Sequence, residues 1–81
     1  METRQLLLIT HLPVRASAAE RVMTLHADVR DARDRLQKQL GDVSHRYMGA
    51  GWVADPDGIH YEPTPEGHAI VATLQLTRGE S

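Results

Sequence analysis

The sequence predicts an α+β domain in which one long helix packs on a three- or four-stranded, mainly antiparallel sheet. Three observations indicate this fold. A short apolar run ending at Pro13 is typical of a strand, the stretch from residue 18 has the apolar spacing of a helix, and the chain after residue 42 alternates like strands separated by turns. The 81 residues suit one small domain, which we assign to residues 1–81.

The first predicted strand covers residues 4–12. Successive side chains of a strand point to opposite faces, and here both faces are mainly apolar. Leu6, Leu8 and Leu12 share one face, and Leu7 and Ile9 share the other. A strand that is apolar on both faces is typical of a sheet covered on both sides, so we expect this strand in the interior of the sheet.

A helix is predicted over residues 18–40. Ser17 and Glu20 form a capping box, in which the serine hydroxyl accepts a hydrogen bond from the Glu20 backbone N–H and the carboxylate reaches back. Gly41 is a typical helix terminator. One narrow apolar stripe then follows the helix, with Ala18, Val22, Leu25, Val29, Ala32 and Leu36 at alternating spacings of four and three.

The rest of the chain predicts strands and turns. Asp55-Pro56-Asp57-Gly58 is a strong turn signal, because proline suits its second position and glycine can take positive φ. The predicted strands are residues 45–54, 59–62 and 68–77, with a second turn at 63–67.

Two registers are compatible with these turns. In the first, Ala54 faces Ile59 and Glu62 faces Gly67, and one cross-strand row contains Trp52, Tyr61 and His68. In the second, residues 55–67 form one long loop and the last strand pairs directly with residues 45–54. The first register gives a candidate ligand-binding row, because aromatic rings beside one titratable group are typical of a small-ligand pocket.

The sheet is predicted to keep one face without cover. The helix stripe would pack on the face that carries Ile59, Ile70, Ala72, Leu74 and Leu76. The opposite face would carry Val53, His60, Ala69, Val71, Thr73 and Gln75, and no element remains to cover it. With the first strand, it supplies a candidate oligomer interface of Leu7, Ile9, Val53, Val71 and Thr73.

Composition excludes several classes of protein. Nine Lys and Arg against eleven Asp and Glu leave no basic excess, so we expect neither nucleic-acid nor membrane binding. Cysteine is absent, so disulfides and thiolate metal sites are excluded. The longest apolar run, residues 6–9, is too short for a signal peptide or a membrane span, and we expect a cytoplasmic protein.

No pattern in the chain indicates catalysis. The five histidines lack metal-ligand spacing, and His60 and His68 are expected on opposite faces of the sheet. Asp55 and Asp57 are explained by the turn that they form. No nucleophile, base and orienting group can be placed together, so we expect no enzyme activity, no catalytic residues, no metal and no cofactor.

The order strand, long helix, strand, strand resembles the βαββ unit of SIMPL-domain proteins. The resemblance rests on the Ser-Ala-Ala-Glu opening of the helix, the glycine after it and the closing run Ala69-Ile70-Val71-Ala72-Thr73-Leu74-Gln75-Leu76-Thr77. Chain length and element order are also similar to those of dodecins, small oligomers that store flavins. The SIMPL resemblance implies the βαββ fold and no catalytic residue.

These observations favour a non-catalytic homo-oligomeric assembly or protein-binding module that uses the uncovered face. Self-association would add the stability that a core of this size lacks. Two alternatives stay open. The chain could bind a flavin-like planar metabolite through the row of Trp52, Tyr61 and His68, or it could be a small phage-type inhibitor of a larger macromolecular machine.

Overall fold

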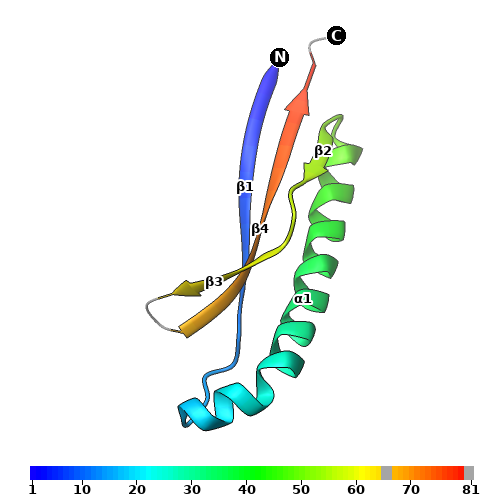
Figure 1. Cartoon of the computed structure of the whole chain (residues 1–81). Coiled ribbons are helices and arrows are strands. Elements are labelled where there is room, and N and C mark those ends of the chain that lie inside the picture. The colour runs from blue at the N-terminus through cyan, green and yellow to red at the C-terminus, as the bar shows by residue number, and fades with distance from the viewer. Residues whose placement is uncertain (65–66, 80–81) are drawn as a thin grey trace.

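The computed structural model describes residues 1–64 and 67–79, and it confirms the α+β fold. One long helix packs on a four-stranded antiparallel sheet, and Figure 1 shows the helix running along one side of the strands. In chain order the elements are β1 (Glu2–His11), α1 (Ala18–Gly49), β2 (Val53–Pro56), β3 (His60–Thr64) and β4 (Gly67–Arg78).

The last strand, β4, is the centre of the sheet. On one side it pairs with the whole length of β1, from Glu2 opposite Arg78 to His11 opposite Ala69. Its other side pairs with two short strands in succession, β3 near the beginning of β4 and β2 near its end. The sheet is therefore three strands wide, and its second edge is divided between β2 and β3.

The sequence predictions are wrong about the position of the first strand and about the first hairpin. The first strand was expected in the interior of the sheet, but β1 is an edge strand with the helix on one face only. The predicted hairpin between residues 54 and 59 does not form, because β2 and β3 both pair with β4. The alternative register was correct in pairing residues 53 and 54 with the last strand, but its long loop, residues 55–67, contains the last two residues of β2 and all of β3.

The helix begins where the sequence predicts. The Ser17 hydroxyl accepts a hydrogen bond of 3.1 Å from the backbone N–H of Glu20. The predicted end at Gly41 is wrong, because α1 continues to Gly49 and includes residues 45–49, which were assigned to a strand. The positive φ that follows the helix belongs instead to Gly51, at 92°.

The longer helix follows from packing. Beyond Gly41 the apolar spacing continues through Val43 and Tyr47, and both side chains pack against the core. An interior glycine costs a helix about 1 kcal/mol relative to alanine. Partial burial of two large apolar side chains, each worth about 1.5–3 kcal/mol when complete, offsets that cost.

The core lies between α1 and one face of the sheet. The predicted division of β4 is confirmed, because Ile70, Ala72, Leu74 and Leu76 face the helix and are buried. The helix contributes mainly Ala32, Leu36 and Leu40. The predicted apolar stripe does not pack on the sheet in the first turns of the helix, where Val22 is 75% exposed.

Candidate functional site

The sheet face opposite the helix carries a patch of apolar side chains without cover. Cross-strand pairing places Leu7 beside Thr73 and Ile9 beside Val71. Within residues 1–64 and 67–79, no helix or strand packs on this face. We define the open-face patch as Leu7, Ile9, Ala69, Val71 and Thr73.

The side chains of the patch differ in accessibility. Leu7 is 63% exposed and Ile9 is 44% exposed, whereas Val71 is 3% exposed. The central strand is flanked on both sides, because Val71 lies between Ile9 of β1 and His60 of β3. Contact with another molecule would therefore be made mainly by the side chains of β1, while the smaller side chains of β4 lie deeper between the strands.

Four of the five predicted interface residues come together, and the fifth does not. Val53 lies on the same face and is 66% exposed, but it pairs with Thr77 at the far end of β4. The polar row of Gln5, Gln75 and Asp55 separates it from the patch. Polar side chains also border the other end of the patch, where His11 and Glu62 flank Ala69.

The predicted ligand row is divided between two places. Tyr61 and His68 are neighbours, with ring centres 5.4 Å apart and planes inclined by 21°, and the Tyr61 hydroxyl is hydrogen-bonded to His68 Nδ1. The structure contradicts the single row, because Trp52 precedes β2 near the opposite end of β4. The expected register for Tyr61 fails too, since this residue pairs with Ile70.

Trp52 is buried by its own set of neighbours. Its ring packs edge-on against Tyr47, with centres 6.0 Å apart. The guanidinium carbons of Arg4 and Arg78 lie 5.3 and 4.6 Å from the ring centre, within the range of cation–π contacts. Because the indole is 7% exposed, stacking with a planar ligand would require these neighbours to move.

A cavity of about 330 Å³ lies between the beginning of α1 and the beginning of β4. Its lining residues are Leu12, Val14, Arg15, Ser17, Ala18, Arg21, Gly67 and His68. A helix N-terminus and two arginines suggest an anion site. The two guanidinium groups share the carboxylate of Asp28, and Arg15 Nη1 also lies 3.9 Å from Glu20 Oε1, so two acidic groups of the chain balance their charge.

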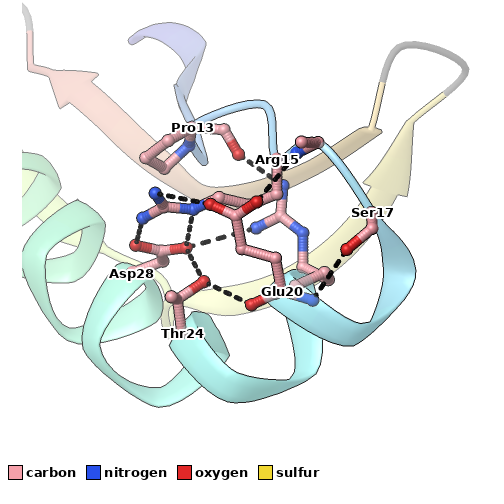
Figure 2. Close-up of polar contacts among 8 residues, drawn as sticks. Pro13, Arg15, Ser17, Glu20, Thr24 and Asp28 are labelled. Atoms are coloured by element: carbon pink, nitrogen blue, oxygen red, sulfur yellow. Dashed lines mark hydrogen bonds and ion pairs between the residues drawn. The ribbon is translucent and has the colours of Figure 1, made fainter.

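Asp28 is the centre of a polar network that sequence reasoning missed (Figure 2). Its side chain is 5% exposed and contacts both arginines. Arg15 donates two hydrogen bonds to the carboxylate, including one of 3.0 Å from Nε, and Thr24 donates another of 2.9 Å. Arg21 Nη1 lies 3.5 Å from Asp28 Oδ2, and Arg21 also donates to the carbonyl of Pro13.

This network fixes the connection between β1 and α1. The hydrogen bonds from Arg15 lower the pKa of the Asp28 carboxyl below its ordinary value, although burial acts in the opposite direction. The same pair raises the pKa of Arg15. A sequence signal was present, because Asp28 lies three residues after Leu25 and four before Ala32, on the helix face that packs inward.

Metal-ligand clusters and membrane-spanning helices are both absent from the described residues. Among residues 1–64 and 67–79, no group of three or more His, Asp or Glu side chains could hold a metal ion. In the same part of the chain, α1 is not apolar enough to cross a membrane.

Comparison with known proteins gave no relative. No family model, curated protein or solved structure matches the chain, so the resemblance to SIMPL-domain proteins stays a prediction.

Proposed function

We propose that this chain is a non-catalytic self-associating module and that the open-face patch is the contact surface between copies. The observation that carries the proposal is the exposure of Leu7 and Ile9 beside buried Val71, on a face that no described element covers. Exposed apolar patches of this kind are typical of interaction surfaces.

The large solvent-accessible surface area of the chain supports association with a partner. The chain exposes 5721 Å², whereas a compact monomer of 9.0 kDa exposes about 4850 Å². The excess of about 870 Å² is close to the ~800 Å² that each partner buries in an interface of standard size. The radius of gyration, 15.5 Å, also exceeds the value of about 12 Å for a compact domain of this length.

The chemistry of the patch favours a second copy as the partner. Its five residues carry no charge, and the polar groups around it include both a carboxylate and an imidazole, Glu62 and His60, whose atoms lie 3.9 Å apart. In a two-fold interface each surface meets itself, which requires self-complementarity. An uncharged apolar centre meets this requirement, whereas a patch of one charge would repel its copy.

The test is a comparison of two variants by light scattering. Ile9→Glu places a charge in the patch, and Val53→Glu places the same charge on the same face outside it. Both residues are β-branched and exposed, so each substitution should leave the fold intact. Val71 is unsuitable, because it is 3% exposed and a charge there would destabilise the fold.

We expect Ile9→Glu to raise the dissociation constant of the assembly at least tenfold, because a carboxylate loses hydration in an apolar contact. Val53→Glu should change it by less than about threefold. Equal effects of the two substitutions would contradict the proposal. Binding of a planar metabolite with quenching of Trp52 fluorescence, in a wild-type protein that stays monomeric, would favour the ligand hypothesis instead.

A further inference from the structure

We propose a second interface on this molecule, in which the β1 strands of two copies pair edge to edge, antiparallel, around a two-fold axis at Leu7. It differs from the open-face patch, because it uses the backbone at the edge of the sheet. It rests on the proposed function in one respect, namely that the partner is a second copy of this chain.

The outer edge of β1 has free hydrogen-bonding groups. In an antiparallel pair, residues alternate between those that bond to the partner strand and those whose N–H and C=O point away. Leu12 N–H donates to the carbonyl of His68, 2.9 Å away, so the even-numbered residues of β1 bond to β4. The outward groups therefore belong to Thr3, Gln5, Leu7, Ile9 and His11.

A second contact supports this alternation. Thr73 pairs with Leu7, and its carbonyl accepts a hydrogen bond of 2.7 Å from Asp57 N–H, on the side of β4 away from β1. Thr73 therefore does not bond to Leu7, as the alternation requires. Among the described elements, β1 contacts only β4 and α1, so its outer edge has no strand partner.

The two edges of the sheet are protected very differently. Proteins usually protect exposed edges by short strands, prolines and charges. The edge formed by β2 and β3 has all three: strands of four and five residues, Pro56 and Pro63, and the carboxylate of Asp55. The β1 edge is ten residues long and contains no proline or lysine.

The charges on β1 do not protect its edge either. Glu2 is paired with Arg78 of the central strand. Arg4 lies over the ring of Trp52 on the helix face. Both charged groups are therefore directed over their own sheet rather than toward a strand that approaches from outside.

The outward groups select one register. When Leu7 lies opposite Leu7 of the second copy, Gln5 lies opposite Ile9 and Thr3 opposite His11. All five outward residues then pair, whereas any shift leaves at least one without a partner. On the helix face this register places Leu6 opposite Leu8 of the second copy, and both side chains are only partly buried in one copy.

The two interfaces are compatible. Edge pairing joins two sheets with their helices on the same side, so the two open-face patches lie on one continuous surface. Stacking of two such pairs through these patches would close an assembly of four copies with perpendicular two-fold axes.

Light scattering on a set of variants distinguishes the two interfaces. Gln5→Pro removes an outward N–H and leaves the bonds to β4 intact, and proline is tolerated at such edge positions. Gln5→Ala is its control. We expect four copies for the wild type and for Gln5→Ala, two for Gln5→Pro, two for Ile9→Glu and one for the variant with both Gln5→Pro and Ile9→Glu.

Each failure has its own pattern. If edge pairing is absent, Gln5→Pro leaves the number of copies unchanged while Ile9→Glu lowers it. If the open-face contact is absent, the wild type has two copies, Ile9→Glu leaves them unchanged and Gln5→Pro gives one. A wild type that stays monomeric overturns both proposals.

A disulfide test checks the register and does not depend on the proline variant. The chain has no cysteine, so introduced thiols react only with each other. Directly paired strand residues have Cα atoms about 5.5 Å apart, within disulfide range. Thr3→Cys mixed with His11→Cys should give a crosslinked dimer under mild oxidation, and neither variant alone should. Crosslinking of Thr3→Cys alone, or none in the mixture, would overturn the register.

Discussion

At the scale of single residues, the network around Asp28 is the most specific feature of this chain. A nearly buried carboxylate requires partners, and Asp28 has two arginines and a threonine. These contacts join the loop after β1 to the third turn of the helix and fix where α1 starts relative to the sheet. They also keep Arg15 and Arg21, the two arginines that line the cavity, close to an acidic group.

Asp28→Asn should destabilise the protein at neutral pH, because the amide keeps the shape of the side chain but removes the negative charge that Arg15 and Arg21 contact. Urea unfolding at equal protein concentration measures the loss. Asp31→Asn, on the exposed side of the same helix, is the matched control and should leave the free energy of unfolding nearly unchanged.

The effect of Asp28→Asn should depend on pH in a defined direction. The folded state lowers the pKa of Asp28, so its carboxylate stabilises the fold above the ordinary value of 3.8. That contribution is lost as pH falls through the lower pKa of the folded state. The difference in stability between wild type and variant should be constant near neutrality and narrow below about pH 4. A difference that persists unchanged in acid would contradict this role.

At the scale of elements, local signals predicted the beginning of the helix but not its end. The capping box needs only Ser17 and its neighbours, so it could be identified from sequence. The end of the helix depends on the packing of Val43 and Tyr47 against the core, and that core forms only when β2 and β4 are in place. Gly41 is therefore an interior helical glycine, although its residue type predicted a terminator.

Gly41→Ala should stabilise the protein by about 1 kcal/mol, because alanine is the better helix former. A Cβ atom at this position meets nothing within 4 Å. Gly51→Ala is the matched control and should destabilise, because Gly51 has a φ of +92°. Urea unfolding gives both values, and destabilisation by Gly41→Ala would mean that the helix ends at Gly41.

The faces of the sheet could be predicted even though its pairing could not. The structure shifts the pairing of β3 by two residues from the expected register, and a shift of two leaves every side chain on its original face. The residues of the helix face and of the open face were therefore predicted correctly although the pairing was not. The row of Trp52, Tyr61 and His68 was not predicted correctly, because it required particular residues to be neighbours along the sheet.

At the scale of the whole molecule, the chain is a two-layer structure in which one face of the sheet has no covering layer. Its dimensions are 56 × 21 × 15 Å, and the elements of residues 1–64 and 67–79 form one helix layer and one sheet layer. A single helix can cover one face of the sheet, and Leu7 and Ile9 on the other face are left exposed to solvent. The uncovered face could be predicted from the number of helices and strands. The unprotected edge of β1 could not, because it depends on the order of the strands in the sheet.

The most direct test of this account is the mass of the wild-type protein, measured by light scattering from low to high micromolar concentration. We expect a mass that is a multiple of 9.0 kDa and decreases on dilution, because copies associate through the open-face patch. A mass of 9.0 kDa over the whole range, with Leu7 and Ile9 accessible to solvent, would contradict the central claim.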